Sequence, residues 1–477
     1  MEQTFCFVNG AQIDRSTKRQ MRRHMMMGKN AGKTVQRRSK KELAWKSFEG
    51  KDNQSKKEIL QRGNRDLDAV TLPVNRIGRW AQAHLHYYEP TSIYDNVLSG
   101  LAFPVELTPH FAEVISTYFL FISDKLYPVS LGISMESSKY TWIRVLMADE
   151  AAFHCNIAQM QACNELFLGD GEDSPMAMYH LSKTLEHVQA RLQSAEALSD
   201  STMSLVMALI TQEQVRHQHE AASIHMDGLV GMIQLRGGLA SLEGCLPVLL
   251  KACKTDLMYT LQREVAPRFH RDNMTAIKCT LASLHLPFDN ETSHMLAQHS
   301  ELDPRLQDVL GDVISTSTLF NDLPSTRKVD LYLYQEIFVS ILYRLHAIPF
   351  HPNPNLPPTI GDAYHVGLTL FMMSLFLQHG RHRILQYSNV TRRLKDVLES
   401  MTLEQEDWLR FWLLMVEAVW VAEDEGTEWL VRMVGEQARK MGLETWKDAR
   451  DAVLRYPWIG ALHDEPGRLI WEKARFS

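Results

Sequence analysis

The chain has 477 residues, of which 45% are hydrophobic and 23% are charged, the ordinary range for globular proteins. A chain of this length can bury a large core, so its stability requires no disulfide or metal. Its six cysteines form no C-x-x-C pair, which excludes a compact redox or zinc motif of that type. No apolar run reaches the roughly 20 residues that span a bilayer, and no cationic segment followed by an apolar one opens the sequence. We therefore expect an intracellular protein that does not span a membrane.

The net charge of −6 conceals a strong division along the chain. Residues 15–65 contain 17 Lys or Arg against 4 Asp or Glu, whereas residues 66–477 contain 34 against 51. A short basic segment beside a large acidic body is typical of contact with nucleic acid or a membrane surface. We divide the chain into a flexible basic arm, residues 1–65, and a body, residues 66–477, with an internal division near 286–305.

Two clusters carry much of the positive charge of this arm: Arg22-Arg23, and Arg37-Arg38-Ser39-Lys40-Lys41. Their spacing is typical of a two-part nuclear import signal, and the same charge attracts nucleic-acid phosphates. The predicted import or phosphate-contact residues are Arg22, Arg23, Arg37, Arg38, Lys40 and Lys41. The alternative is a solvated, disordered tail, which this composition also gives.

Apolar residues recur at helical spacing from Thr108 onward, and Thr108-Pro109 is a typical cap and first-turn pair. After that first helix, the pattern predicts helices over residues 140–167, 178–197, 203–222, 225–236, 247–261, 306–317, 329–345, 362–379, 390–401, 404–421, 427–441 and 446–456. Ser199–Ser201 supplies caps for the helix that begins at 203. No Asn-Gly or Asp-Gly pair lies between two alternating patterns, as a hairpin would need. The sequence predicts an all-α fold.

In the helix over 178–197, one face carries Leu181, Leu185, Val188, Leu192 and Ala195. These positions follow the helical period, so we expect them to be buried together.

Residues 220–239 read EAASIHMDGLVGMIQLRGGL, between two long helical patterns. Gly237-Gly238 after Arg236 predicts a helix that ends in a left-handed turn. We expect Arg236 to pair with Glu213 or Asp256, and His225 and Asp227 to cap the short helix. These roles are structural, because helix ends and buried polar groups need partners whatever the function.

The order of His225, Gly228, Leu229, Arg236, Gly237 and Gly238 in this segment resembles the fungal-specific transcription factor domain, the regulatory body that often accompanies zinc-cluster modules. Further segments similar to this family follow the same order along the chain, at 7–9, 22–25, 179–192, 204–213, 254–257, 409–420, 429–441 and 446–456. The last similar segment contains His463, Asp464, Pro466, Gly467 and Trp471. The resemblance implies a nuclear regulator of metabolic gene expression, including secondary metabolism.

The family's zinc cluster uses six cysteines near the N-terminus, but Cys6 is the single cysteine among the first 154 residues. The DNA binding of that module therefore does not carry over to this chain. The resemblance then implies DNA contact through the basic arm, or association with a protein partner or a second copy.

Two groups of histidines and carboxylates are candidates for a metal or catalytic site. His217 and Glu220 lie three residues apart, and Glu150 with His154 could supply the second helix of a carboxylate–histidine site. Nothing in the sequence brings these pairs together, so a solvated histidine face is the preferred interpretation. His463-Asp464 is similar to the pair of metal-dependent phosphohydrolases, a fold that requires further ligands on earlier helices.

The sequence contains no phosphate-binding loop, dinucleotide fingerprint or G-x-S-x-G elbow. It predicts no catalytic residue, no metal site and no cofactor. Two alternatives to a regulator stay open: a helical enzyme or small-molecule-binding protein derived from the same body, and a cytoplasmic scaffold.

Overall fold

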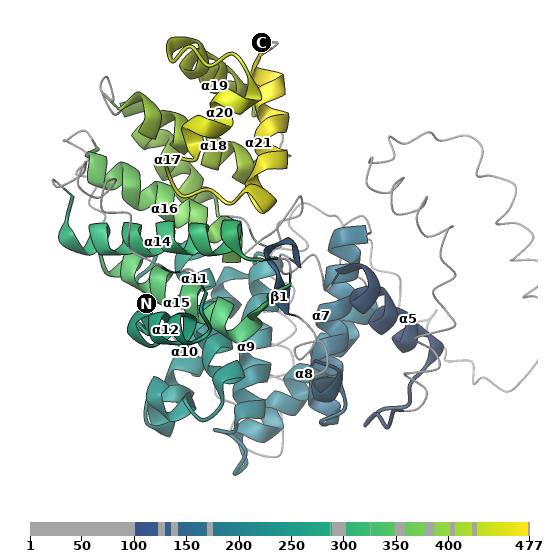
Figure 1. Cartoon of the computed structure of the whole chain (residues 1–477). Coiled ribbons are helices and arrows are strands. Elements are labelled where there is room, and N and C mark those ends of the chain that lie inside the picture. Colours follow the sequence, from purple (N-terminus) through teal and green to yellow (C-terminus); the bar gives the residue numbers. More distant parts are fainter. Residues whose placement is uncertain are drawn as a thin grey trace, which may run out of the picture. The chain divides into compact units, whose positions relative to one another are not determined.

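The computed structural model describes residues 101–122, 129–134, 142–168, 175–286, 288, 302–324, 326–348, 358–376, 385, 387–400, 406–421 and 427–475. Helices account for most of these residues, which confirms the predicted all-α fold (Figure 1). The basic arm, its boundary at residue 65 and most of the division expected near 286–305 lie outside the described residues. Within them, no helix is both long enough and apolar enough to cross a membrane.

The helices before residue 300 include α5 (Pro109–Thr117), α7 (Glu150–Leu168), α8 (Pro175–Leu192), α9 (Asp200–Val215), α10 (His219–Arg236), α11 (Leu246–Arg263) and α12 (Met274–Ser283). The later helices include α14 (Pro304–Asp322), α15 (Leu331–Ala347), α16 (Ile360–Phe376), α17 (Ser388–Ser400), α18 (Asp407–Val421), α19 (Glu428–Lys440), α20 (Trp446–Val453) and α21 (Gly460–Arg475). Shorter turns are the π-helical η2 (Tyr118–Ile122) and the 3-10 turns η4 (Val129–Leu131) and η5 (Leu239–Leu242). A two-residue parallel bridge pairs β1 (Ile133–Ser134) with β2 (Val329–Asp330), Ile133 opposite Val329.

Local signals predicted the caps of two helices correctly, although α9 begins at Asp200 rather than at residue 203. The Thr108 hydroxyl accepts a hydrogen bond from the Phe111 N–H at 3.3 Å, and Ser199 accepts one from the Thr202 N–H at 3.2 Å. Each side chain thereby satisfies one of the N–H groups that a first helical turn leaves without a partner.

Two predictions of helix extent were wrong. The helix expected over 203–222 ends at Val215, because His217 takes a left-handed backbone with φ +57° and α10 starts at His219. The helix expected over 225–236 is longer, since α10 spans His219–Arg236. Residues 460–475 form α21, for which no helix was predicted.

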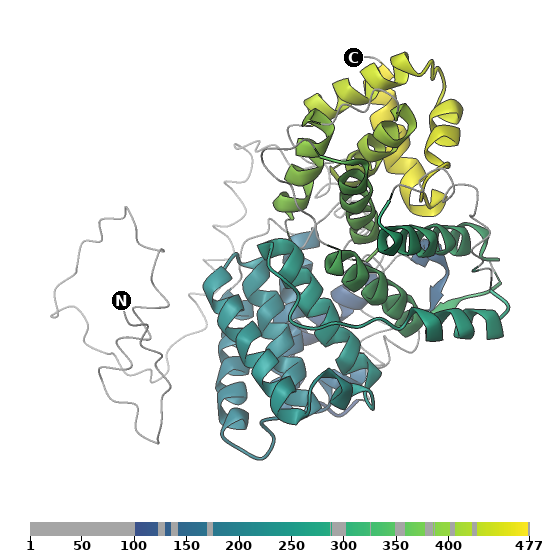
Figure 2. The same ribbon diagram turned by 90° about the vertical axis from the view of Figure 1, so that its left-hand side faces the viewer.

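Two hydrophobic clusters stabilise the described helices. The smaller one gathers side chains of α5, η2 and one face of α7, including Phe153 and Ile157. The larger one takes Ala151 and Cys155 from another face of α7 and extends through α8–α11 to α21. In it, α9 packs against α8, α10 and α11 (Figure 2), while α18 packs against α16, α19, α20 and α21. Helix α7 is therefore buried on two sides.

Helices α16 and α18 approach closely at Gly367. A Cβ atom added there would lie 2.5 Å from Leu413 Cδ2 and 2.7 Å from the Trp412 ring. Trp412 is fully buried, donates its Nε1–H to the Pro457 carbonyl at 3.0 Å and stacks on Tyr456. The ring therefore has little freedom to move aside.

Gly367→Ala should lower the free energy of unfolding by about 1–3 kcal/mol, because the added methyl group overpacks this contact. Gly228→Ala is the matched control, since an added Cβ in the middle of α10 meets nothing within 4 Å. It should raise stability by about 0.5–1 kcal/mol through helix propensity alone. Urea unfolding measures the free energy of unfolding of both variants. Equal changes of the same sign in the two variants would contradict the overpacking at Gly367.

Candidate functional site

Helices α7 and α8 lie side by side (Figure 1). His154 of α7 meets His180 and His187 of α8 between them. The predicted buried face of α8 was only partly right: Leu181 and Val188 are buried, whereas Leu185 and Leu192 are 36% and 48% exposed. The buried stripe also contains Ala177, Thr184 and His180. The helix is rotated relative to the expected face, and this rotation brings His180 against α7.

His154 of α7 and His180 of α8 are both buried, and their Nδ1 atoms lie 2.6 Å apart. One ring must donate its Nδ1–H to the other, so the two imidazoles form a neutral hydrogen-bonded pair. Burial lowers the pKa of His154, and burial together with the neighbouring His154 and His110 lowers the pKa of His180 to about 4. The Nε2 atom of His180 is buried and has no hydrogen-bond partner.

The other side of the His154 ring faces Glu150 and His187. Glu150 Oε1 lies 3.7 Å from His154 Nε2 and 3.8 Å from His187 Nε2. The candidate ligand atoms of the three side chains all lie within 4.8 Å of one another, the one such group of metal-ligating type among the described residues. Glu150 is 56% exposed and His187 is 32% exposed, so the cluster opens to solvent on one side.

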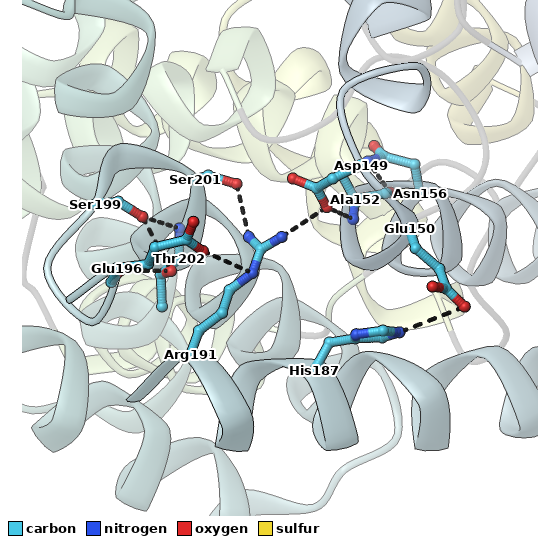
Figure 3. Close-up of polar contacts among 10 residues, drawn as sticks. All are labelled: Asp149, Glu150, Ala152, Asn156, His187, Arg191, Glu196, Ser199, Ser201 and Thr202. Carbon is cyan, nitrogen blue, oxygen red and sulfur yellow. Dashed lines mark hydrogen bonds and ion pairs between the residues drawn. The ribbon is translucent and has the colours of Figure 1, made fainter. Parts of the chain in front are cut away.

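A second polar cluster fixes α7 against α8 directly beside this group (Figure 3). Asp149 accepts the Ala152 N–H at 2.8 Å and forms an ion pair with Arg191 of α8, also at 2.8 Å. Burial opposes ionisation of Asp149, but these hydrogen bonds outweigh it and lower its pKa. Arg191 also donates to Ser201 at 2.9 Å. Because Asp149 is directed toward Arg191, the adjacent Glu150 is left to face His187 (Figure 3).

Glu150 and His154 were considered as one half of a carboxylate–histidine site with His217 and Glu220 as the other half, although a solvated histidine face was the preferred interpretation. His217 lies in the turn before α10, so it does not share a helix face with Glu220. The histidines that do meet Glu150 and His154 are His180 and His187. Their seven-residue separation on one helix was the available signal, since residues seven apart share a face.

The α10 motif contributes helix packing and a helix end. Leu229 is fully buried, and Gly237 and Gly238 have φ values of +113° and +86°, which confirms the predicted left-handed turn. The predicted pairing of Arg236 was wrong: its guanidinium contacts Asp200 and the Leu198 carbonyl, because α10 packs against the start of α9 rather than against Glu213.

The expected capping by His225 and Asp227 was also wrong, because α10 begins at His219 and both residues lie inside it. Asp227 instead pairs with Arg268 at 3.0 Å, and burial lowers the pKa of His225. The Gly228 position is exposed and faces open space.

Asp256, the other expected partner of Arg236, has a different set of donors. Its carboxylate accepts the N–H groups of Arg268 and Phe269 at 3.0 and 2.9 Å, and the Tyr343 hydroxyl at 2.8 Å. Asp256 of α11 therefore binds both the segment that follows α11 and helix α15.

His463 and Asp464 point to different partners. His463 is buried, accepts the Ile459 N–H at its Nδ1 and lies 3.1 Å from Ser374 of α16 through its Nε2. Asp464 accepts bonds at 2.8 Å from Arg450 and from Trp458. The two side chains therefore do not converge on one site.

The remaining residues of the C-terminal motif lie in α21. A Cβ atom at Gly467 would lie 3.1 Å from the Trp446 ring and 3.2 Å from that of Trp458, so glycine permits the close packing of this helix. Trp471 is buried with its ring centroid 6.4 Å from that of Phe411, and Pro466 lies inside α21.

A hollow of about 430 Å³ lies where α12, α14 and α15 meet. Its buried carboxylate, Asp312, already binds Lys278 at 2.7 Å and also contacts Arg344. The cations that line this hollow are thus engaged within the protein, which makes it a weaker candidate than the α7–α8 cluster.

The arrangement at α7–α8 offers two imidazole nitrogens and one carboxylate oxygen on a solvent-accessible side, with a buried imidazole behind them. No protein-family model, no curated protein and no solved structure matches the chain. The assignment of its sites rests on the sequence and on this geometry.

Proposed function

We propose that this chain is a nuclear transcription regulator related to the fungal-specific transcription factor family, with an all-α regulatory body and no zinc cluster. The observation that carries this proposal is the division of charge: a net positive segment over residues 15–65 joined to an acidic body. A segment with this density of positive charge attracts import receptors and nucleic-acid phosphates. The ordered motif segments and the helical body are further support.

In this mechanism the basic segment acts first in import and then in chromatin association. Arg37, Arg38, Lys40 and Lys41 form its densest cluster. The body contributes helical surfaces for a protein partner or a second copy, and DNA is reached through the arm or through a DNA-bound partner.

Replacing Arg37, Arg38, Lys40 and Lys41 with alanine should move a tagged full-length protein from the nucleus to the cytoplasm, because the receptor loses its main cluster of positive charge. The matched control replaces Lys46, Lys51, Lys56 and Lys57, which removes equal charge outside the two clusters. Imaging of both variants measures the effect. Unchanged nuclear accumulation of the first variant, or equal loss in both, would sink the import assignment.

Genome-wide chromatin occupancy separates a regulator from the alternatives. Discrete promoter peaks that weaken on deletion of residues 15–65 are the expected result. A cytoplasmic protein without peaks would favour a scaffold or a helical enzyme instead.

A further inference from the structure

We propose that Glu150, His154 and His187 bind a divalent transition-metal ion of the Zn²⁺ type, which joins α7 to α8. This inference rests on the geometry between the two helices and does not depend on the proposed function. Two imidazole nitrogens and one carboxylate oxygen are ligands that Zn²⁺ commonly takes, with water in a fourth, open position.

The three candidate ligand atoms lie at distances that suit a shared ion. Glu150 Oε1 lies 3.7 and 3.8 Å from the two imidazole Nε2 atoms, too far for hydrogen bonds. Ligand atoms at about 2.0–2.1 Å from a tetrahedral Zn²⁺ are separated by roughly 3.3 Å. The three groups therefore converge at ion-pair distance, and small side-chain rotations would bring them to ligand spacing.

The His154 ring has a fixed hydrogen-bond partner at its other nitrogen. A ligating histidine usually donates its other ring N–H to a fixed acceptor, which sets the tautomer. His180 Nδ1 is such an acceptor, 2.6 Å from His154 Nδ1. With the proton on His154 Nδ1, its Nε2 lone pair is directed at the side of the ring where Glu150 and His187 lie.

Contacts between α7 and α8 hold the site in place before any ion binds. The Asp149–Arg191 ion pair lies one residue before Glu150 and one helical turn after His187, and Ser201 also accepts from Arg191. This contact fixes the start of α7 against α8 (Figure 3). Such support of ligands by neighbouring hydrogen bonds is a regular feature of metal sites.

The nearby positive charge is compensated. Lys183, one turn before His187 on α8, is bound to Glu186 at 2.9 Å. Glu150 supplies the negative charge of the ligand set, and Tyr179 packs beside His154 with its ring centroid 6.2 Å away. A divalent ion therefore meets a carboxylate ligand rather than an unpaired ammonium group.

The test is Zn²⁺ titration of the full-length chain without an affinity tag, in competition with a chromophoric chelator. We expect one saturable site, with affinity reduced about 100-fold in both His187→Gln and Glu150→Gln. Both side chains are partly exposed, so these variants should fold, and circular dichroism verifies it. Glu472→Gln removes an exposed carboxylate of α21 outside the ligand set and should leave the affinity unchanged.

Substitution with Co²⁺ gives an independent readout. The wild-type chain should develop the visible absorption of a low-symmetry, four-coordinate Co²⁺ ion, and His187→Gln should lose it. Absence of saturable Zn²⁺ binding would overturn the proposal. So would binding that persists with the same affinity in both ligand variants, because the ion would then be held elsewhere, such as at the exposed Cys279.

Discussion

Glu336→Ala should lower the free energy of unfolding by about 3 kcal/mol or more, because it leaves a buried guanidinium without its main partner. Arg271 donates to both oxygens of Glu336, from Nε at 2.9 Å and from Nη2 at 2.6 Å. The two side chains are only 10% and 7% exposed. Hydrogen bonding to Glu336 raises the pKa of Arg271 in the wild type. Without Glu336 the guanidinium still keeps its charge, because arginine is not deprotonated in proteins.

The same arginine supplies a matched control. Its Nη1 also binds Glu243 at 2.6 Å, but that carboxylate is 54% exposed. Glu243→Gln should therefore cost at most about 1 kcal/mol, the usual range for exposed ion pairs. Urea unfolding midpoints of the two variants compare the buried and exposed halves of one ion-pair network. If Glu243→Gln lost as much unfolding free energy as Glu336→Ala, burial would not be the reason for the large effect at Glu336.

Replacement of both members of the buried pair tests the physical reason. In Arg271→Met/Glu336→Met the charge and its partner disappear together, so most of the stability lost in Glu336→Ala should return. A double variant as unstable as the single one would mean that the pair itself, and not an uncompensated charge, carries the stability.

Much of the fold was predictable because its signals are local. Thr108, Ser199 and the Gly237-Gly238 pair act through hydrogen bonds or backbone angles within a few residues of themselves. The break between α9 and α10 had no such signal, since no Gly or Pro occurs in residues 216–218 and His217 adopts a backbone conformation that is uncommon for its type.

Contacts between distant residues were not predictable in the same way. Arg236 could have met several carboxylates, and only the packing of α10 on α9 selects Asp200. The candidate metal site shows the same limit. Glu150 and His154 are four residues apart and were found as a pair, whereas the ligand from α8, His187, depends on how two helices rotate against each other.

Acidification should destabilise the protein through His463, the buried histidine that links α21 to α16. Burial lowers its pKa to about 3 in the folded chain, from the ordinary value of 6.5. Between these values the unfolded chain binds a proton that the folded chain does not. The stability that the neutral ring confers is therefore complete above pH 6.5 and is lost as the pH falls toward 3. This histidine alone should cost about 2 kcal/mol between pH 7 and pH 5.

His463→Asn isolates this contribution, because its carbonyl can accept the Ile459 N–H where Nδ1 does now, and the amide does not titrate in this range. The variant is expected to start less stable at pH 7, since the contact with Ser374 is lost. Its unfolding free energy should nevertheless fall less than that of the wild type on moving to pH 5. His285→Asn, at an exposed position, is the control and should keep the wild-type difference. If the unfolding free energy of the wild type and of His463→Asn fell equally between pH 7 and pH 5, protonation of His463 would not be the cause of the acid destabilisation.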